Sequence, residues 1–219
     1  MLNILKCKII IVITLIFCSI ANAQELPYSF EHYTIKNGLS SNTVFSTYRD
    51  SYGFLWVGTE DGLNRFDGYT FKVYRYNADV EAGLKSNHIT ALCEDAAGRV
   101  WIGTNGGSLS YYDRKLDKIV SYDKHVDGKW LSTAITTINT DIAGNIWVGS
   151  YGGLFIINVK DIQKPLDARY TNIEKKFVKM TSRYIFRDSQ GRMWIAAENR
   201  IYQFASNLKE STVYLVQDP

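Results

Sequence analysis

Four aspartates are the residues whose type and spacing could first suggest chemistry, because each stands six residues before a tryptophan. Carboxylates in loops can bind calcium, but a calcium loop brings several further oxygen ligands at close spacing. Here each aspartate is followed three residues later by a glycine, which is typical of a turn. We therefore predict that these carboxylates cap turns and that the chain binds no metal. The aspartates are Asp50, Asp95, Asp141 and Asp188, and the glycines are Gly53, Gly98, Gly144 and Gly191.

The other residues that could suggest a catalytic centre are isolated. Residues 103–107 could pass for a phosphate loop, but no Lys-Ser or Lys-Thr pair follows them. The histidines His32, His88 and His125 are scattered, and none stands with a serine or cysteine in a nucleophile motif. No pair of loop carboxylates recurs at a spacing that indicates a lyase or a glycosidase. We therefore predict no catalytic residue and no cofactor, and we expect that the chain is not an enzyme.

Trp130 is the one tryptophan that breaks the repeat pattern, since it lies in a connection between two repeats. Loops on a rigid scaffold often carry function. The corresponding connections before other repeats carry Asn87, His88 and Arg183. An aromatic ring beside an amide, an imidazole and a guanidinium suits a polyhydroxylated ligand, so these four residues are the candidate ligand-binding site. The alternative is that Trp130 only packs beneath its own loop.

The elements that must position these residues follow from an internal repeat. The tryptophans Trp56, Trp101, Trp147 and Trp194 are 45, 46 and 47 residues apart. A period of this size indicates repeats that stack on one another. In the first unit, residues 43–48, 54–57, 63–66 and 69–76 predict four strands separated by turn residues, among them the pair Asp67-Gly68.

We therefore predict an all-β fold of four four-stranded β-propeller blades, at about residues 40–78, 84–123, 131–180 and 181–216, which together form an incomplete propeller. The repeat tryptophans should lie on the second strands and pack blade against blade. We expect an edge strand near 176–180, a last strand at 212–216, and a further strand at 30–35 of the kind that completes the last blade of a propeller. Four blades of a larger ring should have exposed ends and self-associate.

The amino-terminal residues predict export. Lys6 and Lys8 precede an apolar run at 9–20 and an Ala-x-Ala site at 21–23, so residues 1–23 are predicted to be a signal peptide and 24–219 the mature chain. A lipoprotein signal ending at Cys18 and an uncleaved anchor are the alternatives. Cys93 is then the only cysteine left, and we expect it to be buried. The mature chain has 23 basic residues (25 less the two lysines) and 22 acidic ones, without a basic stripe, so no nucleic-acid partner is predicted.

Residues 50–68, with the pattern D-x-x-G-x-x-W-V-G-T and a following Gly-Leu pair, resemble the two-component regulator propeller repeat. Residues 37–42 resemble the segment that opens the sensor region of hybrid two-component systems. The resemblance implies a periplasmic sensor in which propellers are followed by a membrane helix, a histidine kinase and a receiver, and whose typical signal is an oligosaccharide.

No kinase or receiver follows in this sequence, so we expect a truncated amino-terminal portion of such a sensor. Its partners would be an oligosaccharide, the remaining propeller blades or further copies of itself. The alternative function is a stand-alone secreted propeller that serves as a scaffold for protein interactions.

Overall fold

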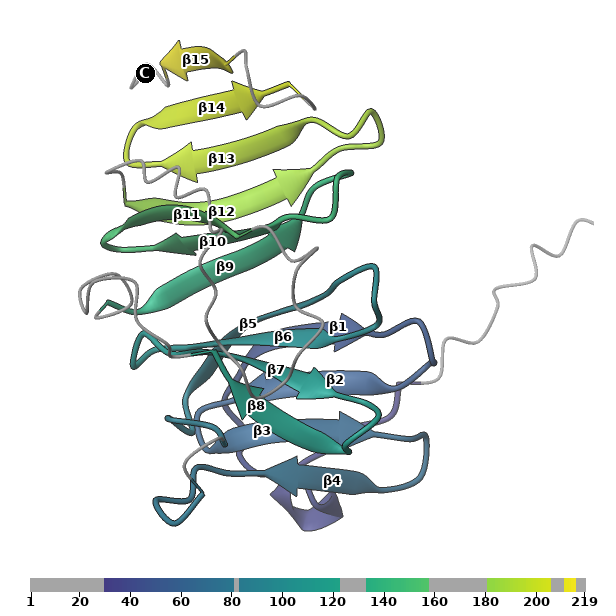
Figure 1. Ribbon diagram of the computed structural model, residues 1–219. Coiled ribbons are helices and arrows are strands. Elements are labelled where there is room, and N and C mark those ends of the chain that lie inside the picture. Colours follow the sequence, from purple (N-terminus) through teal and green to yellow (C-terminus); the bar gives the residue numbers. More distant parts are fainter. Residues whose placement is uncertain (1–29, 81–82, 123–132, 158–180, 206–210, 216–219) are drawn as a thin grey trace, which may run out of the picture. The chain divides into compact units, whose positions relative to one another are not determined.

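The structure is a computed structural model that describes residues 30–80, 83–122, 133–157, 181–205 and 211–215. These residues form four separate antiparallel sheets (Figure 1). Blade 1 contains β1 (Val44–Arg49), β2 (Leu55–Thr59), β3 (Gly62–Phe66) and β4 (Phe71–Tyr74). Blade 2 contains β5 (Ile89–Glu94), β6 (Val100–Thr104), β7 (Leu109–Asp113) and β8 (Lys118–Ser121). Blade 3 contains β9 (Ile135–Thr140), β10 (Ile146–Ser150) and β11 (Gly153–Ile157), and blade 4 contains β12 (Ser182–Arg187), β13 (Met193–Ala197), β14 (Arg200–Phe204) and β15 (Ser211–Leu215).

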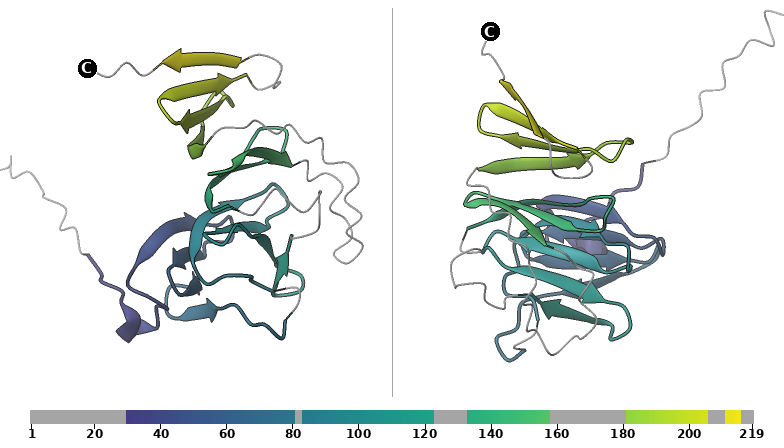
Figure 2. Two further views of the ribbon diagram at one scale, coloured as in Figure 1. Left: turned by 90° about the vertical axis from the view of Figure 1, so that its left-hand side faces the viewer. Right: turned by 45° about the horizontal axis from the view of Figure 1, so that its top comes forward.

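Each sheet is a meander in which successive strands are neighbours (Figure 2). Blades 1, 2 and 4 have four strands, and three strands of blade 3 fall within the described residues. The edge strand predicted near 176–180 lies outside the described part of the chain. The predicted all-β propeller fold is confirmed, because the period of the sequence corresponds to one meander sheet.

The strand predicted at 30–35 is wrong. Residues 30–34 belong to no strand, and Ile35–Asn37 form a short 3-10 helix, labelled η1. The side chain of Thr34 accepts a hydrogen bond from the amide of Lys36, and the side chain of Asn37 accepts one from the amide of Thr34. Gly38 then ends the helix in the left-handed conformation, at φ 99°. These local side-chain bonds compete with an extended backbone and close it into a turn.

The repeat tryptophans lie on the second strand of each blade, as predicted. We call the sheet face that carries them the leading face and the opposite one the trailing face. Trp56 packs on Tyr112 of blade 2, with 4.9 Å between ring centroids, and Trp147 packs on Phe204 of blade 4 at 5.4 Å. Trp101 belongs to the apolar core between blades 2 and 3. These three tryptophans are fully buried, whereas Trp194 is half-buried because no described residue of a further blade covers the leading face of blade 4.

A glycine two residues after each buried tryptophan allows the next blade to approach closely. A Cβ atom on Gly103 would lie 2.5 Å from Ile135 Cγ2 of blade 3, and one on Gly58 would lie 2.8 Å from Ile89 Cγ2 of blade 2. Blade 4 has Ala196 at the corresponding position, and this residue is exposed. The glycine is therefore needed where a following blade packs directly on the second strand.

Cys93 is buried in the core between blades 2 and 3, as expected, and burial raises the pKa of its thiol. No helix among the described residues is long and apolar enough to cross a membrane. The predicted signal peptide and Trp130 both lie outside the described residues.

Candidate functional site

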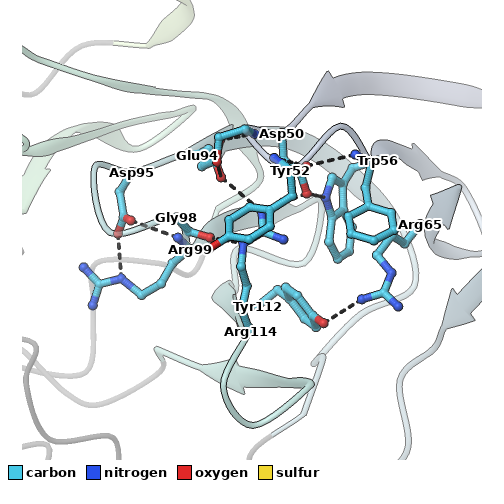
Figure 3. Close-up of polar contacts among 12 residues, drawn as sticks. Asp50, Tyr52, Trp56, Arg65, Glu94, Asp95, Gly98, Arg99, Tyr112 and Arg114 are labelled. Atoms are coloured by element: carbon cyan, nitrogen blue, oxygen red, sulfur yellow. Dashed lines mark hydrogen bonds and ion pairs between the residues drawn. The ribbon is translucent and has the colours of Figure 1, made fainter. Parts of the chain in front are cut away.

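Each repeat aspartate holds both a turn and the repeat tryptophan. In blade 1, one carboxylate oxygen of Asp50 accepts hydrogen bonds from the amides of Tyr52 and Phe54, both at 3.0 Å. The other oxygen accepts one from the indole Nε1 of Trp56 at 2.6 Å (Figure 3). The same indole contact recurs at 2.8, 3.0 and 2.9 Å in blades 2, 3 and 4. Turn capping by the aspartates is confirmed, and the bond to the indole is a second role that the sequence analysis missed.

The carboxylate oxygen that accepts the indole bond also accepts a hydrogen bond from a second side chain. The residue that donates this second bond differs between blades. In three blades the donor stands four residues after the aspartate and belongs to the same turn. These donors are Arg99 at 2.6 Å, Asn145 at 2.7 Å and Arg192 at 2.6 Å. Blade 1 has Phe54 at this position, which has no donor, and Arg114 of blade 2 supplies the bond to Asp50 instead, at 2.8 Å.

Arg114 is the centre of an ionic cluster between blades 1 and 2 (Figure 3). Its guanidinium donates to Asp50, to the carboxylate of Glu94 at 3.0 Å and to the carbonyl oxygen of Gly98 at 2.6 Å. It also lies over the ring of Tyr52, 4.1 Å from the centroid. Glu94 in turn accepts bonds from the amide and the hydroxyl of Ser51 in blade 1, both at 2.8 Å. The cluster therefore joins the first turn of blade 1 to blade 2 in two ways, because Arg114 donates to Asp50 and Ser51 donates to Glu94.

A second ionic group joins the outer strands of the same two blades. Asp117 of blade 2 accepts bonds from Lys72 of β4 at 2.7 Å and from the hydroxyl of Tyr112 at 2.6 Å. Arg65 of β3 lies 3.5 Å from Asp117 and donates to the Tyr112 oxygen at 2.6 Å. The bonds from Lys72 and Tyr112 lower the pKa of Asp117, while burial and the bond to Asp117 raise the pKa of Tyr112.

These two groups are built to fasten blades, because their charged atoms bind one another. Burial disfavours ionisation of Asp50, but hydrogen bonds from Trp56 and Arg114 outweigh this effect and lower its pKa. A carboxylate that accepts this many bonds has little capacity left for a ligand. Among the described residues, no three His, Cys, Asp or Glu side chains gather where they could hold a metal ion.

Of the predicted site residues, Asn87 is engaged in holding blade 1. Its side-chain oxygen accepts the amide of Tyr76 at 2.7 Å, and its side-chain nitrogen donates to Asp61 at 3.2 Å. Its backbone carbonyl accepts the amide of Gly62 at 2.8 Å. Its amide group is therefore already paired, and a ligand role for Asn87 stays a prediction.

His88 has a ring partner that the sequence analysis missed. Phe45 of β1 stacks on the imidazole, with 4.3 Å between centroids and an interplanar angle of 27°. Phe45 keeps 48% of its surface exposed, and His88 is half-buried. The two rings form an aromatic platform at the start of the first strands of blades 1 and 2. Only contact in space could have revealed this pair, because 43 residues separate them in the sequence.

The family model described as two component regulator propeller matches residues 38–61 and 83–106. Both segments run from a Gly-Leu pair through the turn aspartate to just beyond the tryptophan of blades 1 and 2. The chain contains two-component regulator propeller repeats. Histidine kinase P4 of Formosa agariphila is 49% identical over 57 residues, which are 26% of this chain and 4% of that protein.

The solved structures that resemble the repeat chain include extracellular domains of proposed hybrid two-component systems from B. thetaiotaomicron. One aligns with a TM-score of 0.66 and 25% identity over 84% of this chain and 27% of its own length. Another aligns with a TM-score of 0.55 and 22% identity over 85% of this chain and 32% of its own. A catalytically inactive virginiamycin B lyase from Staphylococcus aureus has a TM-score of 0.61, with 14% identity over 85% of this chain and 59% of its own, which shows the fold alone. The chain thus spans less than a third of the two extracellular domains.

Within the two-component regulator propeller repeats, one position of the first strand differs between blades 2 and 3 on the one hand and blades 1 and 4 on the other. Each first strand has an irregular register at its start, which leaves one residue bulged out of the pairing with the second strand. The bulged residues are Phe45, Thr90, Thr136 and Arg183. In blade 2 the threonine hydroxyl donates to the carbonyl of Ile135 in blade 3 at 2.6 Å, and in blade 3 it donates to the carbonyl of Ser182 in blade 4. Blades 1 and 4 have exposed side chains there instead, and the predicted site residue Arg183 is one of them.

Proposed function

We propose that this chain is the ligand-recognition part of an extracellular sensor of the hybrid two-component type and that its ligand is an oligosaccharide. The observation that carries the proposal is the pair of two-component regulator propeller repeats at 38–61 and 83–106, together with the fold of the similar extracellular domains. The charged side chains around Arg114 and Asp117 pair with one another and so are not arranged for catalysis. This is consistent with a chain that binds a ligand while other domains carry out the chemistry. The scaffold alternative is not favoured by these similarities, and the likeness to a lyase supports the fold only.

The proposed location of the ligand is the side where the first strands begin. The aromatic platform of Phe45 and His88 offers an exposed ring face to the C–H groups of a sugar. Arg183 takes the equivalent bulged position in blade 4 and could pair with an acidic sugar. Trp130 lies outside the described residues, between β8 and β9 in the sequence, and it remains a candidate.

The proposal includes export through the predicted signal peptide into the periplasm, where an oligosaccharide would be met. It also includes the remaining blades of a longer sensor, because the chain spans 4% of the similar histidine kinase and about a quarter of one similar extracellular domain.

Isothermal titration calorimetry with a panel of oligosaccharides from partially digested polysaccharides would test the proposal. We expect one oligosaccharide class to bind the mature chain. Phe45→Ala should weaken that binding about tenfold, since an aromatic contact contributes roughly 0.5–1.5 kcal/mol beyond area burial. Tyr69→Ala is the matched control, because Tyr69 is 92% exposed in the turn between β3 and β4, at the far end of the strands. No binding by any oligosaccharide would contradict the function, and equal affinities of the Phe45 and Tyr69 variants would contradict the location.

A further inference from the structure

The bulged threonines of blades 2 and 3 each lie between two carbonyl oxygens. The hydroxyl oxygen of Thr90 is 2.6 Å from the carbonyl oxygen of Ile135 in blade 3 and 3.2 Å from that of Gly103 in its own blade. The hydroxyl of Thr136 contacts the equivalent carbonyls of blade 4 and of its own blade. In both cases the acceptor across the interface is the first residue of the next first strand. The threonine hydroxyl therefore joins each blade to the one that follows.

Blade 1 has the same bulge but cannot make this bond. Phe45 stands at the bulged position, and the equivalent residue across the interface is Ile89, the first residue of β5. Ile89 approaches Gly58 of blade 1 in the same way as Ile135 approaches Gly103 of blade 2. A phenyl ring has no hydroxyl, so the carbonyl oxygen of Ile89 does not receive the bond that the equivalent carbonyls receive from threonine.

The residue that precedes this carbonyl differs as well. His88 stands directly before the first strand of blade 2, where blade 3 has Ala134 and blade 4 has Thr181. The first interface thus has two stacked rings, Phe45 and His88, at the positions where the next two interfaces have a threonine and a small residue. A bond that joins blades is replaced here by a ring surface that remains exposed.

From these differences we infer that the ligand supplies the missing hydroxyl: a sugar hydroxyl donates to the carbonyl oxygen of Ile89 while the sugar ring lies on the aromatic platform of Phe45 and His88. The inference rests on the proposed function and adds to it a contact that selects the ligand. A sugar carries hydroxyls at the edge of an apolar ring face, which matches an acceptor beside an aromatic ring. Backbone carbonyls are among the few precisely placed polar groups that orient a ligand in a binding site.

This contact would make the site selective for the hydroxyl pattern of the sugar. A site built to bind a hydroxyl discriminates against the analogue that lacks it, because the protein group is then left without a partner. The platform alone would accept many sugars, since every pyranose has C–H groups. Threonine at position 45 should therefore have two opposite effects, because it would join blades 1 and 2 and also occupy the acceptor of the ligand.

A comparison of Phe45→Thr with Phe45→Val in the mature chain would test the inference. The two new side chains have nearly the same shape, and only threonine has a hydroxyl. Both variants lose the ring, so a difference between them reports on the carbonyl of Ile89. We expect the melting temperature of Phe45→Thr to be about 2–4 °C higher than that of Phe45→Val, since one additional hydrogen bond shifts the midpoint of a chain of this size by about that much.

The order of the two variants should be reversed in ligand binding. In calorimetry with an oligosaccharide that binds the unmodified chain, Phe45→Thr should bind about fivefold more weakly than Phe45→Val, because its hydroxyl competes for the acceptor. Equal melting temperatures would overturn the inference, since the carbonyl of Ile89 would then not be placed like its equivalents. Equal affinities would overturn it too, although the aromatic platform would still stand. Failure of the unmodified chain to bind any oligosaccharide would instead contradict the proposed function, and the inference with it.

Discussion

Among the described residues, blades 1 and 2 are joined by ionic groups in addition to an apolar core, whereas blades 3 and 4 are joined by neutral contacts alone, although all four blades come from one repeat. Arg114, Glu94 and Asp50 cross the first interface, together with Asp117 and Lys72. In the described part of the second, Trp147 and its neighbours form an apolar core.

The polar contacts between the described residues of blades 3 and 4 are neutral. Asn139 donates to the carbonyl of Ile185 at 3.2 Å, and the hydroxyl of Thr137 accepts the amide of Ile185 at 3.3 Å. The comparison shows that the shared turn and tryptophan determine the structure of each blade. Residues outside the repeat motif determine how strongly neighbouring blades are joined, and by which kind of contact.

Trp147→Ala should have the largest effect of the changes that test this comparison. Trp147 is fully buried between blades 3 and 4, and its indole Nε1 donates a hydrogen bond to Asp141. Truncation of a buried tryptophan costs about 3–5 kcal/mol. We expect urea denaturation to show a loss of this size, and hydrogen exchange to show faster exchange in β10 and β13 than in β2 and β6.

Trp194→Ala is the matched control for that experiment. Trp194 holds the same position in blade 4 and makes the same bond to its aspartate, but it is only half-buried. Its replacement should cost clearly less. Equal losses for the two variants would mean that the turn bond, and not the packing between blades, sets the stability.

Arg114→Met should have the next largest effect, confined to blades 1 and 2. It leaves the carboxylates of Asp50 and Glu94 buried without their cation. Removing one partner of a buried ion pair typically costs 3–5 kcal/mol, and we expect about 3 kcal/mol because Arg114 keeps 16% of its side chain exposed.

The control for Arg114 is Arg192→Met. Arg192 binds Asp188 within one turn and is 38% exposed, so its loss should affect stability much less. Hydrogen exchange should locate the Arg114 effect in the turns at 50–53 and 95–98. An effect spread evenly over all four blades would contradict a separate ionic interface.

The pH dependence of stability should be the smallest of the three effects. The pKa of Asp50 is lowered in the folded chain, so its contribution is present above the usual aspartate pKa and is lost as the pH falls through the lowered value. The same holds for Asp117, and for Asp188, whose pKa the bond from Trp194 lowers to about 2.

The free energy of unfolding should therefore fall between pH 5 and pH 3. In Arg114→Met the fall should be smaller, because one of the groups that lowers the pKa of Asp50 is gone. Urea denaturation of both proteins at the two pH values measures the difference. Parallel pH profiles would show that Arg114 does not set the ionisation of Asp50.

The fold could be predicted from the sequence because the repeat combines three local signals. The aspartate and glycine specify a turn, the tryptophan specifies a buried position, and the period specifies one blade. The strand at 30–35 could not be judged in this way. Its sequence has the pattern of a fourth strand, but a strand needs a neighbour, and the local bonds of Thr34 and Asn37 prevail within the described residues.

The candidate site was less predictable than the fold. Arg114 lies in the turn between β7 and β8, and nothing in its own sequence shows that its partner is Asp50, 64 residues earlier. The absence of a donor at Phe54 is a signal that could have raised the question. The sequence indicates only that Phe45 belongs to a strand, because its exposure depends on a bulge and on the position of His88. The predicted site residues Asn87, His88, Arg183 and Trp130 remain predictions.

The origin of the donor to each turn aspartate bears on how such repeat proteins change in evolution. Where the donor belongs to the same turn, as with Arg99, a blade carries everything its aspartate requires and can be duplicated or deleted as one unit. Asp50 depends on Arg114 of the neighbouring blade, so a gene rearrangement that separated these two blades would leave the buried negative charge of Asp50 without its cation. The first two blades are therefore expected to be inherited together, while later blades are freer to vary in number.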